Sequence, residues 1–102
     1  DSYDHRSELN VRDSDATVIF TFGPPAGGSA LTERMAKKLG KPVLLLDLHR
    51  YSDEEAISML RIWLEQTRAV VLNVAGSRLS EEPRIAVTTA RILRGALVSV
   101  AA

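Results

Sequence analysis

The apolar residues of this chain gather in short runs, separated by stretches in which apolar positions recur every three or four residues. The runs span residues 16–22, 42–47 and 69–74 and are rich in Val, Leu, Ile, Thr and Phe. Runs of this length and composition predict β-strands. The second run, Pro42-Val-Leu-Leu-Leu-Asp47, is apolar almost throughout, which is typical of a strand buried on both faces of a parallel sheet.

The helical spacing predicts one helix before each run and one after the last. The first helix, over residues 3–13, is short and polar. The second extends from a candidate N-cap at Ser29 to about Leu39 and stops at Gly40. Its apolar positions lie four residues apart on one helix face: Leu31, Met35 and Leu39.

Two longer helices follow. Ser52-Asp-Glu-Glu55 has the pattern of a capping box, so the third helix begins there and extends to about Gln66. Its inward face comprises Ala56, Ile57, Leu60, Trp63 and Leu64. We expect Ser80 to cap the last helix, with Glu81 and Glu82 in its first turn, where negative charge suits the helix dipole. The buried face of that helix comprises Ile85, Thr89, Ile92, Leu93, Ala96 and Val100.

The predicted order is α-β-α-β-α-β-α, an α/β fold. Strand–helix–strand units of this length imply parallel strands joined by right-handed crossovers. Ligands of open α/β sheets bind outside the carboxyl ends of the strands, where residues 23–29, 47–52 and 75–80 should meet. A sheet this small leaves an apolar edge, so we expect either that another chain covers it or that part of the domain precedes Asp1.

Composition narrows the classes of partner. The 13 basic and 13 acidic residues cancel, which argues against general nucleic-acid binding and against an anionic membrane surface. The absence of Cys excludes disulfides and thiolate nucleophiles, and the spacing of His5 and His49 does not suit a zinc site. No apolar run approaches the roughly 18 residues of a membrane span, and no signal-peptide pattern opens the chain, so we expect a cytoplasmic location.

A glycine-rich turn, Gly27-Gly-Ser-Ala-Leu-Thr32, joins the first predicted strand to the helix after it. The first N–H groups of a helix lack partners and carry partial positive charge, and glycines let an anion approach them without meeting a Cβ. Gly27, Gly28 and Ser29 are therefore candidate contacts for phosphate or another oxyanion, and Thr32 can add a hydroxyl. The alternative is a tight turn with an N-cap, which any strand–helix unit needs.

Polar residues also stand at the ends of the other predicted strands. Asn73, Gly76, Ser77 and Arg78 lie at the exit of the third strand, and Arg78 is either a bidentate partner for an oxyanion or a solvated loop arginine. Asp47 ends the second strand, where it either accepts from a ligand hydroxyl or caps its loop. His49, in the same loop, is either a general acid or base or simply an exposed histidine.

The acidic and hydroxyl side chains just before the first strand favour a structural role. Asp13 and Asp15 can orient ligand hydroxyls or amines, but residues before a parallel strand lie at the wrong end of the sheet for that contact. Ser and Asp favour turns through bonds between side chain and backbone, so helix termination is the preferred interpretation.

Four segments occur in the order seen in the molybdenum carrier family: Asn10-Val-Arg-Asp-Ser-Asp15, Gly27-Gly-Ser-Ala-Leu-Thr32, Gly40-Lys-Pro42 and Leu72-Asn-Val-Ala-Gly-Ser-Arg78. The chain resembles molybdenum-cofactor carriers from about Tyr3 to Leu97 and, more distantly, the Lonely-guy and lysine-decarboxylase-like group. The resemblance implies a Rossmann-like parallel sheet with flanking helices. Family members open with a further strand and glycine turn, so residues 1–102 resemble the C-terminal part of a larger doubly wound domain.

The resemblance implies a carrier that binds molybdenum cofactor, or a related phosphorylated pterin or nucleotide, without catalysis. The implied partner is a small anionic ligand rather than nucleic acid or a membrane. The implied contacts are Gly27, Gly28, Ser29, Thr32, Asp47, Asn73, Gly76, Ser77 and Arg78. A further possibility is that this chain binds a ligand only when its domain is completed.

The alternative function is a nucleotide phosphoribohydrolase of the Lonely-guy type. That group uses a Pro-Gly-Gly-x-Gly-Thr-x-x-Glu motif, and here the third glycine is Ala30, the threonine is Leu31 and the glutamate is Arg34. Glu33 is one residue away, which places it about 100° around a helix. These departures favour binding over hydrolysis.

We also expect a homo-oligomer. Zero net charge and an unprotected sheet edge both favour association, and the carriers that the chain resembles are oligomeric.

Overall fold

The computed structural model describes residues 2–76 and 84–101, with side chains described for 7–76 and 85–97. Its elements follow the predicted order: α1 (Ser2–Arg12), β1 (Ala16–Thr21), α2 (Gly27–Lys38), β2 (Val43–Asp47), α3 (Asp53–Thr67), β3 (Leu72–Gly76) and α4 (Arg84–Ala101). The predicted α/β fold is confirmed.

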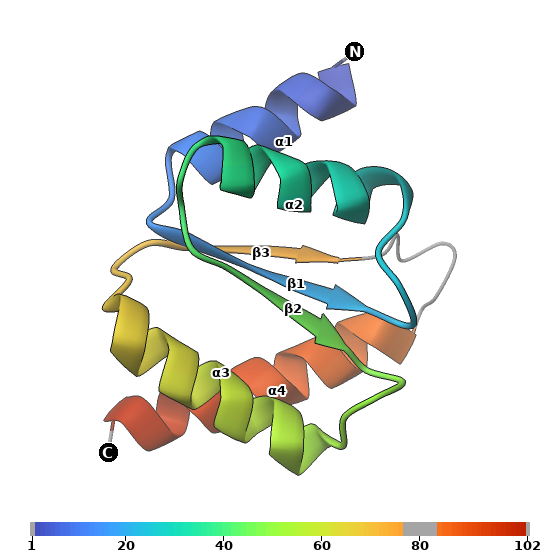
Figure 1. Ribbon diagram of the computed structural model, residues 1–102. Helices are drawn as coiled ribbons and strands as arrows, with labels where there is room; N and C mark the ends of the chain where they lie inside the picture. The colour runs from blue at the N-terminus through green and yellow to red at the C-terminus, as the bar shows by residue number, and fades with distance from the viewer. Residues whose placement is uncertain (1, 77–83, 102) are drawn as a thin grey trace.

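β1 is the central strand of a parallel sheet in the order β2-β1-β3. The register pairs Val18 with Leu44 on one side and with Val74 on the other. α1 and α2 cover one face of the sheet, and α3 and α4 cover the other (Figure 1). Every residue of β1 is buried, because the strand is paired along both edges and covered on both faces.

The main apolar core lies between the sheet and the α3–α4 pair. Val18 and Phe20 of β1 pack there with side chains from β2, α3 and α4: Leu46, Ala56, Leu60, Ile85, Ile92 and Ala96. The predicted inward face of α3 is confirmed, since Ala56 and Leu60 are buried and Ile57, Trp63 and Leu64 pack against the same cluster. In α4, Ile85, Ile92 and Ala96 are buried as predicted, Thr89 and Leu93 are half-buried, and Val100 lies outside the described side chains.

The opposite face of β1 is rich in hydroxyl groups. Side chains alternate along a strand, so Thr17, Ile19 and Thr21 point away from Val18 and Phe20, toward α2. Both β1 and α2 contribute buried hydroxyl residues to the layer between the sheet and α2: Thr17, Thr21, Ser29 and Thr32. The Thr32 hydroxyl donates to the Gly28 carbonyl at 2.9 Å, which satisfies it within its own helix.

The helix ends follow local rules, with one correction. Ser52 and Glu55 form the predicted capping box, with N–H to side-chain distances of 3.2 and 3.0 Å. Gly40 ends α2 at φ +69°, and the N–H of Lys41 reaches the Ala36 carbonyl at 3.0 Å, as in a Schellman motif. The predicted N-cap at Ser29 is wrong: α2 begins earlier, Ala26 holds the cap position, and no side chain caps it.

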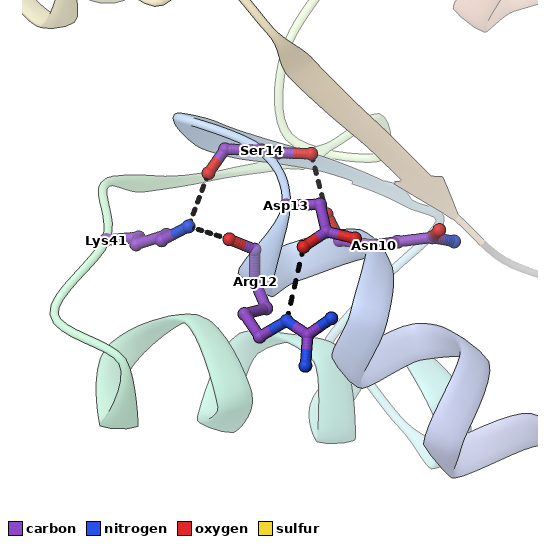
Figure 2. A network of polar contacts seen from close by, with 5 residues as sticks. All are labelled: Asn10, Arg12, Asp13, Ser14 and Lys41. Carbon is purple, nitrogen blue, oxygen red and sulfur yellow. Dashed lines mark hydrogen bonds and ion pairs between the residues drawn. The ribbon is translucent and has the colours of Figure 1, made fainter.

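The segment that joins α1 to β1 is a structural support, as the sequence suggested. The Ser14 hydroxyl donates to the Asn10 carbonyl at 2.6 Å (Figure 2). The Lys41 ammonium donates to the Arg12 carbonyl and, at 2.6 Å, to the Ser14 carbonyl. A cation at the end of α1 also suits the negative end of the helix dipole.

β3 begins later than predicted. The apolar run starts at residue 69, but the strand spans Leu72–Gly76, and Val70 is 90% exposed. The Asp15 carboxylate accepts from the N–H groups of Val70 and Val71 at 2.9 and 2.8 Å, and the Asp15 N–H donates to the Val71 carbonyl at 2.8 Å. These bonds hold the two valines in the approach to the strand.

We predict that Asp15 makes folding stability depend on pH in the acid range. The N–H groups of Val71 and Val70 lower the pKa of this carboxyl from its ordinary value of about 3.9. A carboxyl whose pKa is lower in the folded state contributes its full stabilisation when the pH is above its pKa in the unfolded state. That contribution is lost as the pH falls from about 4 through its pKa in the folded state. Asp15→Asn should therefore lower stability at neutral pH and flatten its decline below pH 4, as measured by urea unfolding monitored by circular dichroism.

Asp13→Asn removes an exposed carboxylate from the same segment and serves as the control. Equal acid profiles for the parent and Asp15→Asn would contradict this role for Asp15.

Candidate functional site

The carboxyl ends of the strands bring two described loops together. The register pairs Thr21, the last residue of β1, with Asp47, the last residue of β2. Residues 22–26 and 48–52 therefore leave the sheet side by side, and α2 and α3 begin at this same edge (Figure 1). Gly76 ends β3 beside Phe20 at the same edge. Ser77, Arg78 and the predicted cap Ser80, with Glu81 and Glu82, lie outside the described residues.

The turn after β1 is held in an unusual backbone conformation. Gly23 has φ +92°, which L side chains rarely adopt, and its N–H donates to Asp47 Oδ1 at 2.8 Å. Its carbonyl accepts from the Thr21 hydroxyl at 2.7 Å. Pro24 and Pro25 then restrict the chain before the helix starts. The turn is therefore fixed at its start by bonds to both strands.

The start of α2 offers backbone N–H groups at an open surface. Gly27 is exposed at φ +52°, and a Cβ built there would meet no atom within 4 Å. Gly27 and Gly28 open the helix, where N–H groups have no acceptor within the helix itself. A small anion can reach these donors with no side chain in the way.

Ser29 and Thr32 lie on a different surface from the two glycines. Ser29 is the third residue of α2, and both side chains are buried toward the sheet. The Ser29 N–H donates to the Ala26 carbonyl at 3.1 Å, as in a tight first turn. Among the predicted contacts in this turn, the structure therefore leaves Gly27 and Gly28 as the accessible ones, through their backbone.

Asp47 fastens the two loops to each other. Its Oδ1 accepts from the N–H of Gly23 in one loop and from the N–H of His49, at 3.0 Å, in the other. The bond from Gly23, followed by that from His49, lowers the pKa of the Asp47 carboxyl, so the group is ionised at neutral pH. Its role in the structure is to position the turn at Gly23.

The aromatic rings of Phe22 and His49, one from each of the two loops that Asp47 joins, lie close together. Phe22 and His49 have ring centroids 5.2 Å apart with an interplanar angle of 39°. His49 is exposed, as predicted, and Phe22 is half-buried. Phe22 was predicted as the last residue of the first strand and not as part of the site. An aromatic residue directly before the glycine at a strand end was the signal that could have placed it there.

Asn73 lies at the wrong end of β3 for this site, which corrects the prediction. It is the second residue of the strand, paired with Thr17 near the start of β1, and its side-chain amide donates to the Thr17 hydroxyl at 3.3 Å. The whole strand lies further along the chain than predicted: it starts at Leu72 instead of residue 69 and ends at Gly76 instead of residue 74. Asn73 therefore lies near the start of the strand and not at its exit.

The described part of the chain shows one further feature of the surface, away from the candidate site. A hollow of about 380 Å³ lies between α1 and α2, away from the strand ends, and is lined by Glu8, Leu31, Arg34, Met35, Lys38 and Leu39. None of the helices in the described ranges is both long and apolar enough to cross a membrane. Within the same ranges, no three His, Asp or Glu side chains are grouped so that they could hold a metal ion.

Comparison with known proteins gives two matches. A family model described as the circularly permutated YpsA SLOG family matches residues 1–97. A crystal structure named as a putative molybdenum carrier protein from Syntrophus aciditrophicus is 42% identical and superposes with a TM-score of 0.90. That match covers 93% of this chain and 60% of the other, so this chain spans less than two thirds of its neighbour's length. No curated protein matches.

We predict that Asp47→Ala makes the turn at Gly23 more mobile. Without the carboxylate, the N–H groups of Gly23 and His49 lose their acceptor and should exchange with solvent roughly threefold faster or more. Amide hydrogen exchange followed by NMR measures both groups. Glu54→Ala, which removes an exposed carboxylate from the first turn of α3, is the control. Unchanged exchange at Gly23 would show that Asp47 does not hold the turn.

Proposed function

The chain belongs to the circularly permutated YpsA SLOG family, and from that premise we propose that it is a carrier for a small anionic ligand. The name of its structural neighbour supports a molybdenum carrier function. The resemblance predicted from the ordered sequence motifs is thus confirmed at the level of family and fold. The proposed ligand is molybdenum cofactor or a related phosphorylated pterin or nucleotide, bound at the carboxyl ends of β1, β2 and β3.

The observation that carries the proposal is the open start of α2. Backbone N–H groups bind the oxygens of phosphate or molybdate and do not ligate a bare metal cation. The accessible groups at Gly27 and Gly28 therefore fit molybdenum in the form of an oxyanion, or a cofactor held through its phosphate. Each ligand named in the proposal carries such a group.

The Phe22–His49 pair supports a ligand that contains a planar ring. Aromatic rings pack favourably in tilted or offset arrangements, and pterins and nucleobases are planar. The pair adjoins the glycine turn, since a Cβ at Gly23 would be 3.8 Å from His49 Nδ1. A ligand with its anionic group at Gly27 and its ring near Phe22 would use both features.

The remaining predicted contacts enter the proposal with different weight. Asp47 positions the turn and has a second oxygen, Oδ2, that suits a ligand hydroxyl or amino group. Gly76 stands at the correct edge of the sheet. For Ser77 and Arg78, the proposal rests on their place in the sequence directly after β3.

The alternative, a phosphoribohydrolase, is less well supported by the described residues. Arg34 replaces the glutamate of the hydrolase motif and lines the hollow between α1 and α2. Glu33, the nearest glutamate, is 3.5 Å from the Lys37 ammonium, one turn further along α2. Release of ribose 5-phosphate from AMP by the parent protein, abolished in Glu33→Gln, would favour the enzyme over the carrier.

We predict that Gly27→Ala weakens ligand binding and that Gly40→Ala does not. Both glycines have positive φ and open space at the Cβ position, and they flank the same helix. Each substitution should cost about 1–2 kcal/mol of stability, because alanine is strained in this conformation. Only the methyl group at residue 27 would occupy the approach to the first N–H groups of α2.

Isothermal titration with sodium molybdate, inorganic phosphate, AMP and isolated molybdenum cofactor tests this prediction. We expect the tightest ligand to lose about tenfold in affinity in Gly27→Ala and to bind Gly40→Ala like the parent. Equal losses in both variants would assign the effect to stability, and failure of all four ligands to bind the parent would overturn the carrier proposal.

A further inference from the structure

The largest apolar side chains of α2 lie outside the core. The residues of this helix that are buried are small: Ser29, Thr32 and Ala36. Leu31, Met35 and Leu39 instead line the hollow of about 380 Å³ between α2 and α1, two helices that lie on the same face of the sheet (Figure 1). Leu31 and Met35 are half-buried, and Leu39 is 42% exposed. The side of α2 that adjoins α1 is therefore apolar and open to solvent.

Two cations border this apolar surface. Arg34 and Lys38 line the same hollow, and both are exposed. Successive helical residues are about 100° apart around the axis, so the two cations lie on one side of Leu31 and the apolar residues Met35 and Leu39 lie on the other. The apolar side continues into the buried face of the helix. The hollow thus has an apolar wall near the sheet and a cationic rim toward solvent.

The cationic rim has no counter-ion within the part of the chain whose side chains are described. Glu33 and Lys37, one turn apart on the same helix, form an ion pair at 3.5 Å, whereas Arg34 and Lys38 form none with a described residue. These two cations are also one turn apart, where like charges repel. Glu8 of α1 is the one carboxylate among the described lining residues, so the hollow has an excess of positive charge.

We propose that the hollow between α1 and α2 binds a small organic anion with an apolar body, such as a medium-chain carboxylate. The apolar body would displace water from Leu31, Met35 and Leu39. The carboxylate would lie between Arg34 and Lys38 and would relieve their repulsion through charge-assisted hydrogen bonds. This site is separate from the start of α2 at Gly27, and the proposal does not depend on the carrier function.

The two parts of the hollow together select this class of ligand. A bare oxyanion such as phosphate would pair with the cations but would leave the apolar wall in contact with water. A neutral apolar molecule would cover that wall but would leave the cations without a partner. The volume lies toward the lower end of the range for ligand pockets, about 300–1,000 Å³, which suits a small molecule better than a helix of another protein.

Methionine methyl groups can report the binding, because the chain contains two methionines. Met35 lines the hollow, whereas Met59 belongs to α3 on the other face of the sheet (Figure 1). In NMR spectra of protein labelled with ¹³C at the methionine methyl groups, octanoate should shift the Met35 signal saturably and leave the Met59 signal in place. Acetate, which lacks the apolar body, and 1-octanol, which lacks the charge, should each bind about tenfold more weakly or less.

Three variants test the charges of the rim, and circular dichroism confirms that each is folded. Arg34→Gln with Lys38→Gln should weaken octanoate about tenfold and leave 1-octanol unaffected. Lys37→Gln with Arg94→Gln removes two exposed cations outside the hollow and should leave octanoate binding unchanged. Glu8→Gln removes the opposing carboxylate and should strengthen octanoate binding about twofold.

Several results would overturn the proposal. Octanoate could fail to shift the Met35 signal, or it could shift Met35 and Met59 alike. The control variant could lose as much affinity as Arg34→Gln with Lys38→Gln, which would assign the effect to net charge. Finally, Gly27→Ala could abolish octanoate binding, which would place the carboxylate at the start of α2 and not in the hollow.

Discussion

The burial of β1 is the constraint on which the rest of this structure depends. The strand is paired along both edges and covered on both faces, so none of its six residues is exposed. Parallel pairing on both sides makes all strands end at one edge, and the crossover helices α2 and α3 then begin there (Figure 1). The site follows from this arrangement, since it places the start of α2 beside the loop that follows β2.

Hydrogen bonds to two carboxylates fix the positions of loops that strand pairing alone leaves loosely defined. At the carboxyl edge, Asp47 joins the loops after β1 and β2 through two backbone N–H groups. At the opposite edge, Asp15 holds the approach to β3 in the same way. Both carboxylates accept from residues distant in sequence, with Gly23 and Asp47 separated by 24 positions and Asp15 and Val70 by 55. Such bonds depend on the assembled fold and leave little trace in local sequence.

This difference explains how much of the structure could be predicted from the sequence. Apolar runs and helical periodicity gave every element in its correct order, because burial dominates both patterns. The capping box at Ser52 was predictable because it involves residues three apart. The start of β3 was not predictable, because the carboxylate of Asp15, which is distant in sequence, holds Val70 and Val71 outside the strand. The misplacement of Asn73 followed from that error. The cap of α2 was also misplaced, at Ser29 instead of Ala26, since glycine at a positive φ lets the helix begin three residues earlier.

The hydroxyl-rich layer beneath α2 has a consequence for how this family can vary. Threonine, serine and alanine are small, so around Ile19 this layer is built from smaller side chains, Thr17, Thr21, Thr32 and Ala36, than the aliphatic and aromatic layer on the other face. The thickness of that layer fixes how high the first turn of α2 stands above the strand ends. A valine in place of Thr32 keeps the volume, whereas a leucine or phenylalanine would lift the helix and carry Gly27 away from the turn at Gly23. We therefore expect the size of buried side chains, more than the identity of surface groups, to limit the evolutionary drift of this edge of the sheet.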